Sequence, residues 1–222
     1  MTQNQSQKIR IQDQTLLLLP QKAMFWKEQD MLIVSDVHWG KSAHFRKNGI
    51  AIPDTVNQSN IKRLNGLVEE LRPKTILFLG DLFHSDPNEE IERFGDWRKS
   101  HASISMILTI GNHDLLTRFE YEKMELECVN RYQCGPFLFL HDEAEKQDKG
   151  SYTISGHIHP AVQLKSKGRQ SLHVPCFFFG NQQAILPAFG AFTGTYHISP
   201  AQNDTVFAIV EDSIVKISPK FR

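Results

Sequence analysis

The sequence has few cysteines and no long apolar run. Its three cysteines, Cys128, Cys134 and Cys176, form neither a CxxC pair nor a Cys–His zinc spacing, which argues against a structural zinc site and favours reduced thiols. No apolar stretch approaches the roughly 20 residues that a membrane-spanning helix needs. The polar opening, MTQNQSQKIR, lacks the apolar centre of a signal peptide, so we expect a cytoplasmic protein without a membrane segment.

An excess of charge of either sign is also missing. Lys and Arg number 25, as do Asp and Glu, so the formal net charge is zero, which weakens the case for strong nonspecific binding to nucleic acid. The basic residues nevertheless gather in two segments, Lys41, Arg46 and Lys47, and Lys165, Lys167 and Arg169. Internal repeats, low-complexity tracts and linkers rich in Pro or Gly are absent, so we expect one domain over residues 1–222.

Strand and helix patterns alternate in the first half of the chain. Apolar runs at 31–35, 75–79 and 103–110 predict buried strands. Apolar residues at helical spacing predict helices from about 54 to 72 and from 88 to 101. A β-α-β-α-β series favours parallel strands joined by helical crossovers.

The other apolar runs predict strands with little helix between them. They lie at 8–27, where three short strands are expected, and at 136–141, 151–156, 161–165, 170–179, 183–186, 205–210 and 213–217. Two packed sheets in one domain accommodate both halves of the chain better than two separate domains do. The expected fold class is therefore α/β.

Strands in both halves lead into the same kinds of side chain. Five apolar runs end, in chain order, at Asp36 and His38; Asp81; Asn112, His113 and Asp114; His141; and His157 and His159. The carboxyl ends of strands form the edge of an α/β sheet at which ligands bind. Carboxylates, imidazoles and an amide at such an edge predict a metal centre with oxygen and nitrogen ligands, which suits Mn, Fe, Zn or Co better than a soft metal.

Each of these endings has a plainer interpretation when it is taken alone. A single Asp-x-His or Gly-Asp is commonly structural, and a lone histidine after a strand is ordinary. All five in this order are hard to obtain by chance, so we favour the metal centre. Asp36 and His38 share one side of an extended segment, as His157 and His159 do, so each pair could hold one ion or straddle two. Asp81 has two carboxylate oxygens and could bridge two ions.

One motif is misleading. The segment 40–42 (GKS) ends like a phosphate-binding P-loop, but that motif needs glycine at position 35, where Ser35 stands with Asp36 after it. A carboxylate inside the loop would repel phosphate, so we reject nucleotide binding of that type.

The polar endings run DxH, GD, GNHD, H and GHxH, and this order resembles the calcineurin-like metallophosphoesterase family over residues 31 to about 160. Five longer segments are LLLLP (16–20), DVHWGKSAHFRKNGI (36–50), GDLFH (80–84), VPCFFFG (174–180) and ILPAFGAFTG (185–194). They are similar to segments of the bacterial DNA ligase-associated metallophosphoesterases, and this closer resemblance covers nearly the whole chain.

The resemblance implies a fold and a pair of ions. The fold is a four-layer α/β/β/α sandwich of two mixed sheets flanked by helices. The cofactors are two divalent metal ions, Mn²⁺ first, with Fe, Zn and Co as alternatives. One ion would be held by Asp36, His38, Asp81 and His159, and the other by Asp81, Asn112, His141 and His157.

The resemblance also implies a nuclease or other phosphodiesterase in DNA repair, beside a ligase, a helicase and a nuclease. A hydroxide that bridges the two ions would attack phosphorus directly. We expect His113 to stabilise the transition state and to protonate the leaving oxygen. Asp114 would orient His113 and raise its pKa, would cap a helix over 114–119, or would do both.

Four more side chains are candidates for substrate contacts. Lys41 and Arg46 could clamp phosphate oxygens or could form a solvated helix face. His84 stands where the wider family has an aspartate, in GDxxD, so we expect it beside the ligands or the substrate. Trp39 could stack on a base or pack in the core.

Three other functions compete with this interpretation. The rival substrates are a phosphomonoester and a dinucleoside polyphosphate. A metal-free binding scaffold on the same fold would leave several desolvated carboxylates and imidazoles without a purpose, so we disfavour it.

Overall fold

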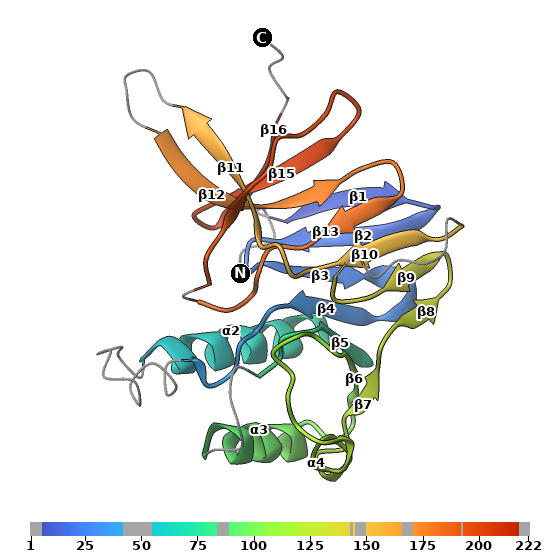
Figure 1. The fold of residues 1–222 in the computed structure, drawn as a ribbon, viewed down its shortest axis with the longest axis vertical. Coiled ribbons are helices and arrows are strands. Elements are labelled where there is room, and N and C mark those ends of the chain that lie inside the picture. The colour runs from blue at the N-terminus through green and yellow to red at the C-terminus, as the bar shows by residue number, and fades with distance from the viewer. Residues whose placement is uncertain are drawn as a thin grey trace.

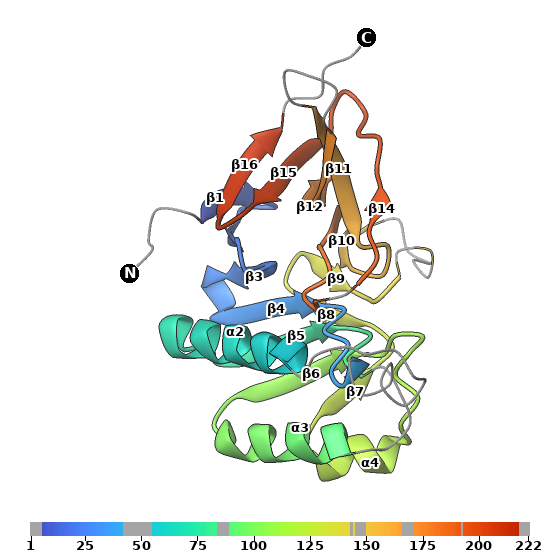
Figure 2. The ribbon, with the colours of Figure 1, turned by 90° about the vertical axis from the view of Figure 1, so that its left-hand side faces the viewer.

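The computed structural model describes residues 6–41, 55–83, 89–142, 144, 150–165, 171–191 and 193–217. Two β-sheets lie one upon the other, and helices cover the outer side of the first sheet (Figure 1, Figure 2). None of the helices within these ranges is both long and apolar enough to cross a membrane.

The first sheet has seven strands, which follow one another in chain order. They are β1 (Gln7–Ile11), β2 (Gln14–Leu19), β3 (Ala23–Trp26), β4 (Met31–Ser35), β5 (Thr75–Leu79), β6 (Ser105–Thr109) and β7 (Glu127–Val129). From β1 to β4 the strands are antiparallel, and the 3-10 helix η1 (Lys27–Gln29) joins β3 to β4. From β4 to β7 they are parallel, because α2 (Thr55–Leu71), α3 (Glu89–Ser100) and α4 (Arg118–Lys123) lie in the connections.

The first two predicted helices are confirmed as α2 and α3. Leu64 and Leu67 of α2 and Phe94 and Trp97 of α3 are buried in one core cluster against the sheet. Trp39 joins this cluster with its ring centroid 5.1 Å from that of Phe94, so it packs in the core instead of offering a surface to a base.

The prediction of a helix over 114–119 is wrong. The helix in this region is α4, and it begins at Arg118 because Thr117 caps it. The Thr117 side chain accepts from the backbone N–H of Glu120, and the Glu120 carboxylate accepts from the backbone N–H of Thr117. This reciprocal capping box satisfies two N–H groups that would otherwise lack partners at the helix start.

The second sheet is also mixed and has nine strands. They are β8 (Tyr132–Cys134), β9 (Phe137–Phe139), β10 (Tyr152–Ser155), β11 (Pro160–Lys165), β12 (Ser171–Phe179), β13 (Gln183–Ile185), β14 (Tyr196–His197), β15 (Thr205–Val210) and β16 (Ser213–Ile217). Strand β10 runs parallel to β9 and β13, whereas the pairs β11–β12, β12–β15 and β15–β16 are antiparallel. The short strands β7, β8 and β14 were not predicted from the sequence.

A second core cluster fills the space between the sheets. From the first sheet it takes Trp26 and Leu77, and from the second it takes Phe137, Phe139 and Phe177. The predicted α/β class with two mixed sheets is confirmed. Among the described residues, the helices cover only the first sheet, so these residues form three of the four expected layers.

The register of the parallel strands determines where the polar residues that follow them lie. Ser35 at the end of β4 is paired with Leu79 of β5, and Leu79 is paired with Thr109 of β6. The three parallel strands therefore end at the same level. The polar residues at the carboxyl end of each strand are delivered to one edge of the sheet.

Phe137→Ala tests the packing between the sheets. Phe137 is fully buried, and its ring lies 4.9 Å from that of Trp26. We expect the free energy of unfolding to fall by about 3–5 kcal/mol, because the truncation removes buried apolar area and leaves a cavity. Denaturant unfolding measures this loss, and Leu172→Ala, at a side chain that is 59% exposed, is the control. Equal losses for the two variants would contradict the packing.

Candidate metal centre

The residues that turn away from the strand ends adopt left-handed backbone conformations. The angle φ is +52° at Asp36, +49° at His38, +49° at Asp81, +68° at His157 and +50° at His159. A non-glycine residue in this region costs on the order of 1–3 kcal/mol. Each of these residues brings a carboxylate or an imidazole, and such strain is typical of a binding or catalytic site.

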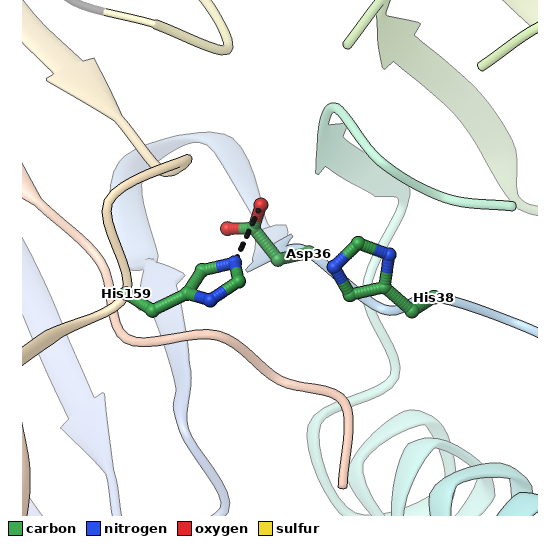
Figure 3. Close-up of side chains that lie close together, drawn as sticks. All are labelled: Asp36, His38 and His159. Carbon is green, nitrogen blue, oxygen red and sulfur yellow. Dashed lines mark ion pairs between the residues drawn. The ribbon is translucent and has the colours of Figure 1, made fainter. Parts of the chain in front are cut away.

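One cluster contains Asp36, His38 and His159, whose candidate ligand atoms all lie within 4.8 Å of one another (Figure 3). Nε2 of His159 lies 3.2 Å from Oδ1 of Asp36. The rings of His38 and His159 meet edge to face with centroids 5.8 Å apart. Nε2 of His38 lies 4.0 Å from Oδ2 of Asp81. The structure thus brings together all four side chains predicted for one ion.

The second cluster surrounds Nε2 of His141. This atom lies 3.0 Å from Nδ1 of His157, 3.1 Å from Oδ1 of Asn112 and 3.5 Å from Oδ1 of Asp81. Nδ1 of His141 lies 3.0 Å from the carbonyl oxygen of Leu79. Because a carbonyl oxygen only accepts, Nδ1 carries a proton, and in the neutral ring Nε2 presents its lone pair to the cluster. His141 had the weakest sequence signal, yet it lies at the centre of the side chains predicted for the other ion.

The contact between Asp36 and His159 tests whether a cation fits. Nδ1 of His159 donates to the carbonyl oxygen of Gly194 over 3.0 Å, so a neutral ring directs the lone pair of Nε2 at Oδ1 of Asp36. Apart from this mutual contact, neither of the two buried atoms has a hydrogen-bond partner within the described part of the chain. A proton or a metal cation between them removes the repulsion. The ligand set and this facing pair therefore fit a divalent cation.

The electrostatics of the site favour positive charge at the same point. Burial alone would raise the pKa of Asp36, but His159, His141 and the Ser35 hydroxyl hold that pKa below its usual value. Burial likewise disfavours the charged form of His159, yet Asp36 raises the pKa of this imidazole. The buried carboxylate therefore stabilises any cation placed beside it.

The two sheets meet at the Asp36 carboxylate. Oδ2 of Asp36 accepts from the backbone N–H of His157 over 3.1 Å and from the hydroxyl of Ser35. Gly156 permits this approach, because a Cβ there would collide with Oγ of Ser35 and would lie 2.6 Å from Oδ2 of Asp36. The Asp36 carboxylate is thus held by donors from the strand ends of both sheets.

His113 lies beside both clusters. Its ring centroid is 5.7 Å from that of His38, and its backbone N–H donates to Oδ1 of Asp81 over 2.9 Å. The His113 side chain is partly exposed, so a substrate at the centre could reach the imidazole.

Asp114 joins the strand-end loops to each other. Its Oδ1 accepts from the backbone N–H groups of Leu82 and Phe83, over 2.9 and 3.1 Å, and its Oδ2 accepts from that of Gly111 over 2.9 Å. Burial raises the pKa of Asp114 to about 6 even though these N–H groups favour its ionised form. None of these three bonds goes to the ring of His113, which Asp114 was expected to orient.

Of the substrate-contact candidates, the structure places Lys41. Burial lowers the pKa of Lys41, and the attraction of Asp81 and Asp36 opposes this shift, so the ammonium group is within the electrostatic reach of both carboxylates. Arg46 and His84 lie outside the described residues.

Two parts of the chain that hold Asp36 in place were not predicted from the sequence. Ser35 is the last residue of an apolar strand, and a hydroxyl at that point is a signal only when the next residue is a ligand. The other support is the loop 186–191, where the N–H of Phe189 donates to the carbonyl of Ser35 over 2.7 Å and that of Gly190 donates to the carbonyl of Asp36 over 3.0 Å. This segment contributed to the family resemblance, but it contains no metal-ligating or acid–base side chain.

Asp114→Asn tests the loop-joining role. An asparagine keeps one acceptor oxygen but turns an amide N–H₂ toward a backbone N–H, so at least one buried donor loses its partner. We expect the free energy of unfolding of the metal-free protein to fall by about 1–3 kcal/mol in denaturant.

Asp204→Asn is the matched control, because Asp204 accepts from the N–H of Ala201 at an exposed turn where water can replace it. We expect a change within about 0.5 kcal/mol. If Asp114→Asn is as stable as this control, Asp114 does not join the loops.

Comparisons with known proteins give the family and the fold. Residues 31–169 match the sequence pattern of the calcineurin-like phosphoesterase family. The structure is similar to that of the Pseudomonas putida nuclease MPE, with a TM-score of 0.78 and 27% identity over 96% of this chain and 100% of that one. The E. coli phosphoesterase Yfce matches with a TM-score of 0.43 and 12% identity, over 86% of this chain and 99% of that one.

No curated protein sequence matches this chain significantly. The pattern that does match spans the stretch that supplies every aspartate and histidine of the two clusters. The chain therefore belongs to the calcineurin-like phosphoesterase family, and it is a metal-dependent phosphoesterase.

Proposed function

We propose that this phosphoesterase is a two-metal phosphodiesterase that cleaves DNA. The observation that carries the proposal is the convergence of two adjacent ligand clusters on Asp81. Its Oδ2 lies 4.0 Å from Nε2 of His38, and its Oδ1 lies 3.5 Å from Nε2 of His141. One carboxylate placed between two sets of ligands is what a pair of ions requires.

The ligands divide between two ions in this proposal. Asp36, His38, Asp81 and His159 hold the first ion, and Asp81, Asn112, His141 and His157 hold the second. Backbone carbonyls that accept from Nδ1 of His159 and of His141 fix the tautomer that leaves each Nε2 free to bind. Oxygen and nitrogen ligands suit Mn²⁺, with Fe, Zn and Co as alternatives.

Divalent cations bound there supply Lewis acidity and positive charge for the transfer of a phosphoryl group to water. The imidazole of His113 protonates the leaving oxygen, a general-acid role that contributes typically 10²–10⁴-fold in rate. Asp81 positions that imidazole by accepting from the His113 backbone N–H. Lys41 binds a phosphoryl oxygen of the substrate, and Arg46 and His84, which lie outside the described residues, stay predicted substrate contacts.

The substrate proposal is supported by the similarity, over 96% of the chain, to a protein named as a nuclease. The segments that resemble DNA ligase-associated metallophosphoesterases support a role in DNA repair with a ligase, a helicase and a nuclease as partners. Two further expectations stay predictions: that the protein is cytoplasmic, and that residues 1–222 form a single domain.

A comparison of rates with Mn²⁺ tests the proposal. The substrates are bis-p-nitrophenyl phosphate as the diester, p-nitrophenyl phosphate as the monoester, and a single-stranded DNA oligonucleotide. We expect kcat/KM for the diester to exceed that for the monoester, and we expect the oligonucleotide to be cut. A preference for the monoester, or an intact oligonucleotide, would contradict cleavage of DNA.

Asp81→Asn tests the shared ligand. The amide oxygen can still accept from the His113 backbone, so the loop is retained while the negative charge is lost. We expect Mn²⁺ affinity, measured by calorimetry, to fall by more than the ~10–100-fold that loss of a residue supporting a ligand costs. Diester hydrolysis should be abolished. Full activity and an unchanged metal content would rule out the shared-ion arrangement.

His113→Ala separates chemistry from metal binding. We expect kcat for the diester to fall by about 10²–10⁴-fold, because a general acid is lost. Bound Mn²⁺ should equal that of the parent protein. His173→Ala, at an exposed histidine on β12, is the control and should keep its turnover. Unchanged turnover in His113→Ala would remove this residue from the mechanism.

A further inference from the structure

The loop 186–191 lies against the backbone that carries Asp36. Besides the bonds from Phe189 and Gly190 to the carbonyls of Ser35 and Asp36, the loop approaches Val37 closely. A Cβ on Gly190 would lie 2.6 Å from the carbonyl oxygen of Val37. The position of the loop therefore sets the position of the Asp36 backbone.

Two side chains of α2 hold this loop from its other side. The guanidinium of Arg63 donates to the carbonyl oxygen of Phe189, and its Cζ lies 4.2 Å from the centre of the Phe189 ring. Nη2 of Arg63 also donates to Oδ1 of Asn60 over 3.1 Å. The same Asn60 oxygen accepts from the backbone N–H of Ala191 over 3.1 Å. The helix α2 is thus hydrogen-bonded to the loop at residues 189 and 191.

We propose that Arg63 and Asn60 are positioning residues for the metal centre and that they act through the loop on Asp36. This inference rests on the proposed metal-binding role of Asp36. Within the described part of the chain, the side-chain hydrogen bonds of both residues go to the loop and to each other, and both are on a helix that packs beneath the sheet (Figure 2). The line of contacts runs from α2 through the loop to the strand end.

Three observations support a functional role over simple packing. Asp36 keeps a left-handed conformation, with φ +52°, that needs outside support. Asn60 is a buried amide whose oxygen serves two donors, one from the helix and one from the loop. Arg63 stays protonated at neutral pH, because burial lowers its pKa only to about 10.

The experiment measures Mn²⁺ affinity by calorimetry in Arg63→Met, Asn60→Ala and Asn60→Asp. Methionine keeps an unbranched apolar chain but removes the donors, and aspartate keeps the acceptor oxygen at position 60. We expect Arg63→Met and Asn60→Ala to weaken Mn²⁺ binding by about 10–100-fold, as loss of a residue that supports a ligand does. Asn60→Asp should remain within about threefold of the parent protein.

Kinetics supply a second readout. The Mn²⁺ concentration for half-maximal diester hydrolysis should rise in the two weakened variants, while KM for the diester at saturating Mn²⁺ stays constant. Lys62→Met is the matched control, because Lys62 is the exposed neighbour of Arg63 on the same helix. It should leave both quantities unchanged. If Arg63→Met does not fold, the Asn60 pair carries the test.

The outcomes separate this inference from the proposed function. If the parent protein binds no Mn²⁺ and cleaves no diester, the proposed function fails. If the parent does both and the variants lower only the unfolding temperature, with Mn²⁺ affinity unchanged, the positioning role is overturned. Weaker Mn²⁺ binding in Asn60→Ala, restored in Asn60→Asp, supports it.

Discussion

The burial of one carboxylate, that of Asp36, is the constraint on which the site depends. A buried ion that lacks compensation costs several kcal/mol. Oδ2 accepts from the Ser35 hydroxyl and the His157 N–H, whereas Oδ1 lies 3.2 Å from Nε2 of His159, where a proton on that imidazole or a metal cation supplies the compensating charge. One oxygen of Asp36 is thus satisfied by fixed donors of the chain, and the other is open to a cation. That asymmetry links the fold to the chemistry of a metal-dependent phosphoesterase.

Neither sheet makes the centre alone. The first sheet supplies Asp36, His38, Asp81 and Asn112, and the second supplies His141, His157 and His159. Distances of 3.1–3.5 Å between side chains of the two sheets depend on how the sheets pack, so the apolar core between them also sets the ligand geometry. At Gly156 the two sheets approach so closely that there is no room for a Cβ atom beside Ser35 and Asp36. Stability and function therefore share one interface.

Local patterns in the sequence were enough to predict α2, α3 and the parallel strands, because each has a clear apolar period. Strand-end position was enough to predict that Asp36 and Asp81 would meet, because β4 and β5 are parallel and end level. His141 follows β9 in the other sheet, so its place beside them depends on how the two sheets pack. The α4 start was mispredicted, because Asp114 and Thr117 are both good caps and only tertiary structure decides between them. Asp114 instead accepts from the backbone N–H groups of Leu82 and Phe83 in a distant loop and from that of Gly111 in its own loop.

The supports of the site could not be predicted for the same reason. Nothing local in the sequence of α2 marks Asn60 or Arg63 as different from other polar residues of a helix. Their partners, near Phe189, lie more than 120 residues away along the chain. Contacts at that separation depend on how the layers pack, and a single sequence does not encode them in any short motif.

Anomalous diffraction from crystals of the Mn²⁺-loaded protein is the most direct test of the two-ion centre. We expect two manganese peaks per chain, one between Asp36 and His159 and one beside Nε2 of His141, with Asp81 bound to both. Peaks elsewhere, or no peak between Asp36 and His159, would contradict it.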